Sequence, residues 1–152
     1  MLFTSVDAEL LEFHIFAFNV DNPASFTFHR NERLKSRKTI ASLFKSGRSF
    51  VAYPLRVVWV LSHAGEQGRA TVSISVSKRI FKTAVQRNRL KRQMREAYRL
   101  HKHEFYLQLE RHQKHVSLMI TYIAKEPLPY AEIDAGLKKL IRKFPFETLS
   151  AP

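Results

Sequence analysis

The stretch from Lys78 to Arg99 constrains the fold most, because a helix formed by it has apolar side chains on one side only. At about 100° per residue, its apolar residues make one narrow stripe, formed by Leu90, Met94, Ala97, Tyr98 and His101. We therefore expect a helix from about Ala84 to His101 that lies on a sheet through this stripe. Its remaining surface must face away from the core.

The outward side of this helix is almost purely cationic. Like charges four residues apart destabilise a helix by a few tenths of a kcal/mol, so an ordinary solvated face, the alternative interpretation, normally mixes signs. Arginine also favours bidentate contact with phosphate. The pattern predicts a phosphate-binding face formed by Asn88, Arg92, Arg95 and Arg99, with Lys91 beside them and Arg87 and Arg89 at the margins.

The net charge of +13 and the pI near 10.3 point to a polyanionic partner. Seven Lys or Arg against one acid lie between Arg30 and Arg48, and ten against one lie between Lys78 and Lys102. Phosphate contacts supply affinity without sequence readout, which suits recognition of a folded RNA by its shape. No apolar run approaches the roughly 18 residues of a membrane span, so no membrane partner is expected.

The chain has no cysteine, which excludes a disulfide framework and a thiol nucleophile and makes the cytoplasm the expected compartment. Residues 1–24 carry four acids and no Lys or Arg, so we expect an acidic extension, disordered or loosely docked, without the positive region of a secretory signal. Residues 25–146 form the expected domain, and residues 147–152 form a tail.

The expected order of elements is αβββαβα, in the α+β class. Ser36 can cap a short helix that Gly47 ends in a left-handed conformation. The runs LRVVWVLS and RATVSISVS resemble an antiparallel hairpin, and in the second run small hydroxyl side chains alternate with Val72, Ile74 and Val76. A short strand before Pro54, a strand from Val116 to Ala124 and a helix from Tyr130 to Phe144 complete the order.

The string SVSKRIFKTAVQRNRLKRQMREAYR resembles the signature of the bacterial ribonuclease P protein family. In that signature a strand ends in a basic pair, followed by Arg-Asn-Arg, Lys-Arg, Arg-Glu and an aromatic residue before Arg. The resemblance extends over roughly residues 26–146, and it includes Arg33-Leu34-Lys35, Phe44 and Gly47 upstream.

The resemblance implies an α/β sandwich with a small mixed sheet and a left-handed βαβ crossover. It also implies a cleft beside the sheet for the 5′ leader of precursor tRNA, for which the candidates are Phe44, Arg48, Arg56 and Trp59. Phe44 could equally be an ordinary core residue, and Ile40 stands where a relative often has Phe. The residues implied to bind the catalytic RNA are Lys78, Arg79, Arg87, Asn88, Arg89, Lys91, Arg92, Arg95 and Arg99.

No catalytic or metal-binding residue is expected on the protein, because its carboxylates are scattered and Glu96 lies among arginines, where an intrahelical ion pair is expected. The implied function is assistance to a catalytic RNA that uses Mg²⁺ held mainly by the RNA. The implied partners are the ribonuclease P RNA, at one protein per RNA, and precursor tRNA. Two alternatives stay open: a structural, ribosomal-type RNA-binding protein and a protein-only nuclease.

Overall fold

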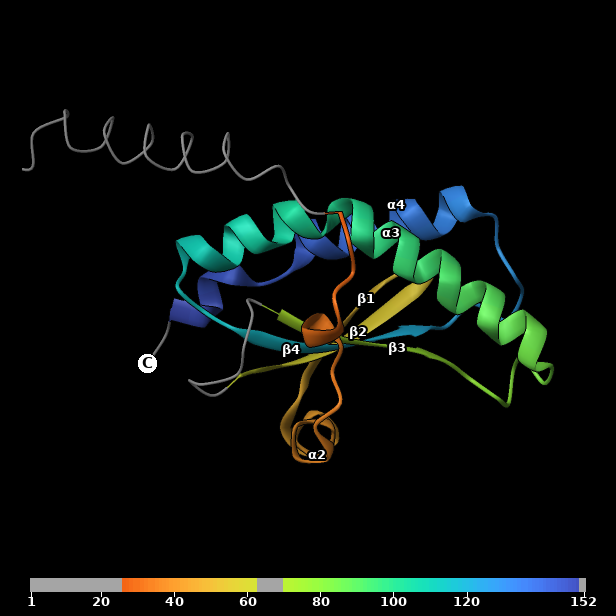
Figure 1. Cartoon of the computed structure of the whole chain (residues 1–152), viewed down its shortest axis with the longest axis horizontal. Coiled ribbons are helices and arrows are strands. Elements are labelled where there is room, and N and C mark those ends of the chain that lie inside the picture. The colour runs from red at the N-terminus through yellow and green to blue at the C-terminus, as the bar shows by residue number, and fades with distance from the viewer. Residues whose placement is uncertain (1–25, 63–69, 151–152) are drawn as a thin grey trace, which may run out of the picture.

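A mixed four-stranded sheet separates two layers of helices in the computed structural model, which describes residues 26–62 and 70–150 (Figure 1). Two long helices cover one face of the sheet, and a short helix lies against the other face. The helices are α2 (Arg37–Ser46), α3 (Ala84–Arg111) and α4 (Tyr130–Lys143), with 3₁₀ turns η1 (Arg30–Glu32) and η2 (Phe146–Ser150). The predicted α+β class is confirmed.

The sheet is built around β4 (Val116–Tyr122), five of whose seven residues are buried. Such a nearly continuous apolar run is typical of a central strand that is covered on both faces. Its neighbours are β2 (Leu55–Leu61), which pairs antiparallel, and β3 (Ala70–Val76), which pairs parallel. The edge strand β1 (Arg48–Ala52) pairs with β2, so the order is β1-β2-β4-β3.

The predicted hairpin of β2 and β3 is wrong, because β4 lies between these two strands. The hairpin in the structure joins β1 to β2, and it contains the short strand that was expected before Pro54. Parallel pairing of β3 with β4 requires a crossover connection, which α3 supplies. The left hand of this crossover stays a prediction from the resemblance.

Helix α2 begins where predicted but ends for a different reason. The Ser36 side chain accepts a hydrogen bond from the Thr39 amide at 3.3 Å. Gly47 is not left-handed, because its φ is −66°. A Cβ at Gly47 would instead collide with the Leu43 carbonyl oxygen and lie 2.6 Å from Val58 Cγ1. Glycine is therefore required by the close approach of α2 to β2.

Helix α3 continues ten residues beyond the predicted end at His101, to Arg111. Phe105, Tyr106 and Leu109 extend its buried stripe by almost three turns. Lys102, which interrupts the stripe in the sequence, is itself buried in an ion pair. Gln113, with φ of 52°, follows the helix in the left-handed conformation that commonly ends one.

The main core lies between the sheet and helices α3 and α4, where aromatic rings from separate elements meet. The Phe144 ring lies 5.1 Å from the Trp59 ring and 5.1 Å from the Phe105 ring, measured between centroids. Leu149, in the predicted tail, is 1% exposed and belongs to the same core. The predicted extension 1–24 lies outside the described residues.

Candidate nucleic-acid interface

The loop between β3 and α3 presents the first candidate cations, Lys78 and Arg79, which are both exposed. Arg87 holds this loop against the helix by donating to the Phe81 carbonyl at 2.8 Å and to the Lys82 carbonyl at 2.7 Å. Arg87 therefore orders the loop, a role that the charge pattern alone did not indicate.

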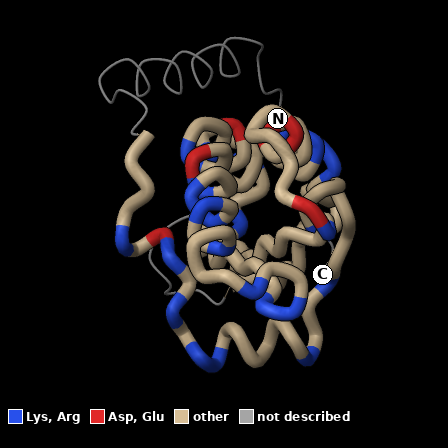
Figure 2. The backbone as a smooth tube through the Cα atoms, turned by 90° about the vertical axis from the view of Figure 1, so that its right-hand side faces the viewer, with Lys and Arg blue, Asp and Glu red and all other residues tan. Residues whose placement is uncertain are grey.

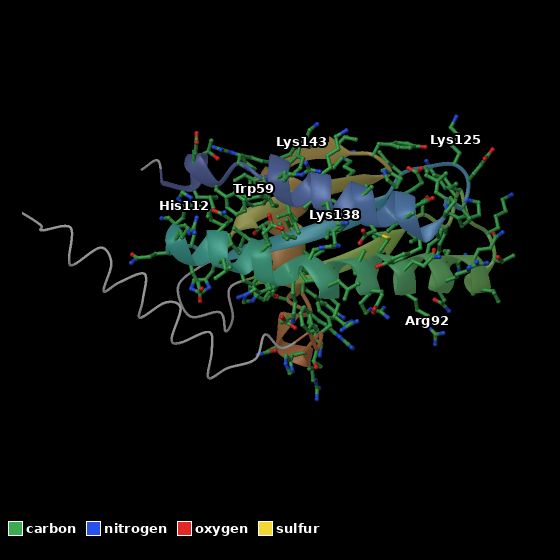
Figure 3. The ribbon with its side chains drawn as sticks, turned by 90° about the horizontal axis from the view of Figure 1, so that it is seen from above. Trp59, Arg92, His112, Lys125, Lys138 and Lys143 are labelled. Carbon is green, nitrogen blue, oxygen red and sulfur yellow. The ribbon has the colours of Figure 1, made fainter. Side chains whose placement is uncertain are left out.

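The outward face of α3 has the predicted division between buried and solvent-facing residues. Leu90, Met94, Ala97 and Tyr98 are each at most 2% exposed. Asn88, Arg89 and Arg92 are exposed, and Lys91 and Arg95 are half-buried. Figure 3 shows Arg92 extending from α3 on the side away from α4. The contacts of these residues with RNA stay a prediction.

Arg99 is fixed by intramolecular bonds. Its Nε and Nη2 donate to the Glu96 carboxylate at 2.9 and 2.6 Å, and its Nη1 donates to the Phe26 carbonyl at 3.0 Å. The hydrogen bond from Arg99 lowers the pKa of Glu96. The intrahelical pair expected for Glu96 is confirmed.

A groove of about 440 Å³ runs along this face of α3. Its aromatic walls are Phe28, from the segment before η1, and Tyr130, from the start of α4. The Tyr130 hydroxyl is buried without a hydrogen-bond partner among the described residues. The groove therefore combines ring surfaces with polar side chains, which are Arg92, Gln93, Arg95, Glu96 and Arg99.

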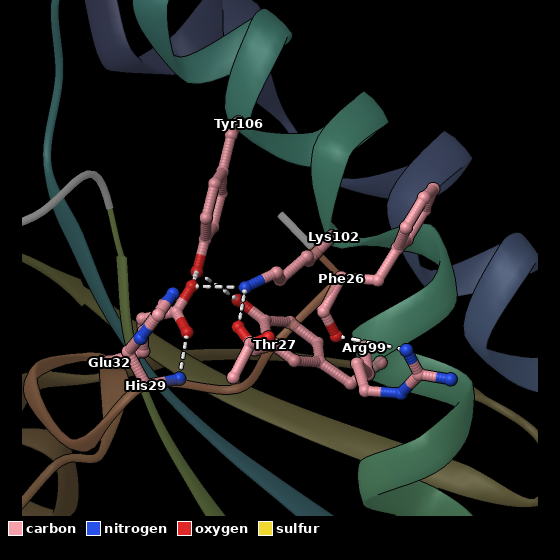
Figure 4. A network of polar contacts seen from close by, with 8 residues as sticks. Phe26, Thr27, His29, Glu32, Arg99, Lys102 and Tyr106 are labelled. Atoms are coloured by element: carbon pink, nitrogen blue, oxygen red, sulfur yellow. Dashed lines mark hydrogen bonds and ion pairs between the residues drawn. The ribbon is translucent and has the colours of Figure 1, made fainter. Parts of the chain in front are cut away.

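A buried ion pair ties residues 26–36, which we call the strap, to α3 (Figure 4). Lys102 Nζ donates to Glu32 Oε1 at 2.7 Å and to the Thr27 carbonyl at 2.6 Å. Tyr106 donates to the same Glu32 oxygen at 2.7 Å, and the His29 amide donates to Glu32 Oε2 at 2.6 Å. Burial opposes the charge of Glu32, but these hydrogen bonds outweigh it and hold the pKa below its usual range.

The sequence analysis missed this cluster, although the signal was present. Lys102 lies one turn after Tyr98 on the buried stripe, where a cation needs a buried acid. Glu32 is the only acid among the basic residues from Arg30 to Arg48. Their distance in the sequence hid the pairing.

The strap passes the edge of β3 on its way from α3 to α2 (Figure 1). The Leu34 amide donates to the Val72 carbonyl at 3.0 Å, and Arg33 forms a parallel bridge with Val72. Beside this contact lies a groove of about 660 Å³, lined by His29, Arg30, Asn31, Arg33, Leu34, Lys35, Ser36 and Thr71. Figure 2 shows Lys and Arg residues following the strap into α2.

The sheet face that α2 packs against carries only part of the predicted leader cleft. Phe44 is 76% exposed on α2, so it is not a core residue. Arg56 alternates with buried Leu55 and Val57, and its Nη2 donates to Ser49 Oγ at 3.4 Å. Trp59 belongs to the opposite face, where it packs on Phe144, and the Arg48 guanidinium lies 5.8 Å from the Trp59 ring. Trp59 and Arg48 are therefore separated from Phe44 by the sheet.

Hydroxyl side chains line the same face as Arg56. Ser117 Oγ lies 2.9 Å from Ser62 Oγ and 2.9 Å from Thr71 Oγ1, so three strand segments are joined by a chain of hydrogen bonds. Ser73 and Ser75 follow Thr71 at alternate positions of β3 and are half-buried. The predicted polar face of this strand is confirmed.

Comparison with known proteins identifies the family. The family model described as Ribonuclease P matches residues 28–145. The chain belongs to the ribonuclease P protein family. The ribonuclease P protein component of Porphyromonas gingivalis is 37% identical over 122 residues, which cover 80% of this chain and 89% of the relative. That of Clostridioides difficile is 30% identical over 116 residues, covering 76% and 94%.

Solved structures of ribonuclease P proteins share the fold. The protein from Thermotoga maritima gives a TM-score of 0.59 at 22% identity, covering 74% of this chain and 97% of that one. The protein from Staphylococcus aureus gives 0.56 at 24% identity, covering 73% and 93%. At these identities the likeness concerns the fold alone.

The described part of this ribonuclease P family member holds neither a metal-binding cluster nor a membrane-spanning helix. Among residues 26–62 and 70–150, no three His, Cys, Asp or Glu side chains lie together as a metal site would require. In the same part of the chain, no helix has the length and hydropathy that crossing a membrane would need.

Proposed function

We propose that this chain is the protein component of ribonuclease P, and that it docks on the catalytic RNA through the outward face of α3. The observation that carries the proposal is the set of solvent-facing cations on α3 in a chain of this family. The buried stripe fixes the helix on the sheet, so these side chains are held in register before RNA arrives. Preformed cationic surfaces of this kind bind the backbone of folded RNA.

The RNA performs the hydrolysis in this proposal, and the protein raises affinity for precursor tRNA. Mg²⁺ is held mainly by the RNA. One protein binds each catalytic RNA, and the complex works in the cytoplasm. Sedimentation of the reconstituted complex measures the stoichiometry, and a mass with two proteins would contradict it.

In this proposal the 5′ leader lies on the sheet face that α2 packs against. Phe44 offers an exposed ring for stacking on a base of any sequence, and Arg56 of β2 offers an exposed cation on the same side of the sheet. Ser62 and Thr71, the half-buried ends of the hydrogen-bond chain through Ser117, supply hydroxyl groups on the same face. Trp59 and Arg48 take no part, because they lie on the other side of the sheet.

Reconstitution with a bacterial ribonuclease P RNA tests the proposal. At low Mg²⁺ concentration, adding the full chain is expected to increase cleavage of precursor tRNA at the mature 5′ end. The protein alone is expected to cleave nothing. Absence of stimulation would contradict the proposal, and cleavage by the protein alone would favour a protein nuclease.

A further inference from the structure

The strap carries a cationic groove that the docking face of α3 does not include. Arg30, Arg33 and Lys35 line it together with Thr71 from β3. Arg30 and Lys35 are exposed, and neither has an acidic partner among the described residues. Three cations gathered at a concave surface with no neutralising acid mark a site for an anion.

The nearest acid cannot neutralise these cations. Glu32 lies between Arg30 and Arg33 in the sequence, but its carboxylate points away from the groove into the cluster with Lys102 and Tyr106 (Figure 4). The buried pair thus removes the acid of the strap from the surface. It also anchors the strap, so the three cations do not need to be ordered when a ligand binds.

One aromatic ring links the groove to the docking face. The Arg33 guanidinium lies 5.6 Å from the centroid of Phe28, and Phe28 also forms a wall of the groove along α3. Phe28 packs edge-on against the buried Tyr98 ring, with 5.7 Å between centroids. A rigid ring therefore joins the cations of α3 to those of the strap.

The dimensions and the floor of the groove favour a single nucleic-acid strand. A hollow of about 660 Å³ at a sheet edge can receive the sugars and phosphates of one strand, whereas a stiff duplex would meet only its rim. Thr71 lines the groove from β3 and begins the chain of hydroxyl hydrogen bonds on the sheet face that α2 packs against, which we call the open sheet face. A strand that leaves α3 along the strap would thus reach the face that carries Phe44 and Arg56.

We infer that the groove formed by Arg30, Arg33, Lys35 and Thr71 binds the phosphates of a single-stranded RNA segment that passes from the α3 face to the open sheet face. This inference rests on the proposed function. It adds a second phosphate-binding site on a different element. The site contributes affinity and fixes the route of the strand across the protein. It contributes no base specificity, because cations that contact phosphate do not distinguish bases.

The test compares two triple variants of the full chain. One carries Arg30→Gln, Arg33→Gln and Lys35→Gln, and the control carries Lys139→Gln, Arg142→Gln and Lys143→Gln, three exposed cations of α4. Both lose the same charge. The control residues lie on the helix that packs over β1 and β2, away from the β3 edge. Circular dichroism checks that both variants remain folded.

The probe is a fluorescent oligouridylate of about 12 nucleotides, titrated at several salt concentrations. The strap variant is expected to lose roughly tenfold or more in affinity. Its dependence of log K on log salt should flatten by about two units, as expected for three lost contacts with a single strand. The α4 control should change affinity by less than about threefold, since it loses only the long-range attraction.

Equal losses in the two triple variants would overturn the inference, because total charge would then explain the binding. Unchanged oligouridylate affinity together with strap-dependent binding to phosphatidylglycerol vesicles would overturn it in favour of a membrane surface. Stimulation of precursor tRNA cleavage by the wild-type chain is measured in parallel. Its absence would remove the proposed function, whereas the two triple variants decide the groove by themselves.

Discussion

Glu32 shows how one side chain can organise a surface that it does not belong to. It is 8% exposed and receives hydrogen bonds from Lys102, from Tyr106 and from the His29 amide. Removing one member of a buried ion pair leaves an uncompensated charge in a poorly solvated place. The strap and its cations depend on this cluster.

Glu32→Ala is expected to lower the free energy of unfolding by about 3–5 kcal/mol, measured by urea denaturation. The double variant Glu32→Leu with Lys102→Met should be less destabilised than the single variant, because no buried charge is left unpaired. Glu96→Ala is the control, since Glu96 pairs with Arg99 at the surface and its loss should leave stability nearly unchanged. A double variant as unstable as Glu32→Ala would contradict an ionic role for Glu32.

The stability of the fold should depend on the charge of Glu32 at acidic pH. The pKa of Glu32 is lowered on folding from its ordinary value of 4.5, so the ionised carboxylate stabilises the folded chain. This contribution is present above that value and is lost as the pH falls through the lowered pKa. Between about pH 6 and pH 3, Glu32→Gln should therefore lose less unfolding free energy than the wild type. Parallel pH profiles would contradict this.

At the scale of elements, α3 divides its two tasks between two faces. Its buried face joins the sheet, and its outward face holds the candidate RNA-binding cations. The narrow stripe in the sequence predicted this division as far as Tyr98. The last ten residues escaped prediction because polar side chains interrupt the apolar stripe there. Lys102 is one of them, and in the structure Glu32 satisfies its charge.

Replacing the exposed arginines of α3 should weaken RNA binding without unfolding the chain. Arg89→Ala and Arg92→Ala remove cations that are not buried in the fold. Binding to the ribonuclease P RNA should weaken, and each lost phosphate contact should reduce the salt slope by about one unit. Lys139→Ala on α4 is the matched control. Unchanged binding by both arginine variants would refute the assigned face.

The contact between α4 and the β1–β2 turn should tolerate no added methyl group. A Cβ at Gly136 would lie 2.7 Å from Pro54 Cδ and 3.1 Å from the Tyr53 carbonyl oxygen. Gly136→Ala should therefore lower the unfolding free energy by roughly 1–3 kcal/mol. Ala135, its exposed neighbour, provides the control as Ala135→Ser. Thermal denaturation measures both variants. Equal melting temperatures for Gly136→Ala and Ala135→Ser would contradict the expectation and show that the neighbouring atoms move to accept the methyl group.

At the scale of the whole molecule, local patterns predicted the elements better than their arrangement. The bounds of β2, β3, β4 and the last helix were predicted within two residues, because periodicity and turn residues are local. Strand β1 was expected before Pro54 without bounds. The neighbours of β4 were not predicted, since successive strands usually pair and β4 inserts between two of them. The mostly apolar sequence of β4 was the only hint of a central position, and the strand is almost continuously buried in the structure.

The candidate site was also predicted only where it depends on local spacing. The basic face of α3 follows from helical spacing alone, whereas the strap groove depends on residues 29–36 meeting Thr71 across the chain. The side of the sheet that Trp59 and Arg56 occupy depends on the register of the strands. Both need the assembled sheet before they can be assigned.

The most direct test of the account is single-turnover cleavage of precursor tRNA at low Mg²⁺ by ribonuclease P RNA. The RNA is supplied with the wild-type chain, with the Arg89→Ala, Arg92→Ala double variant, or with Lys139→Ala. The account predicts stimulation by the wild type and by Lys139→Ala, and stimulation by the double variant only at much higher protein concentration. Equal concentration dependence for all three proteins, or no stimulation by any of them, would contradict it.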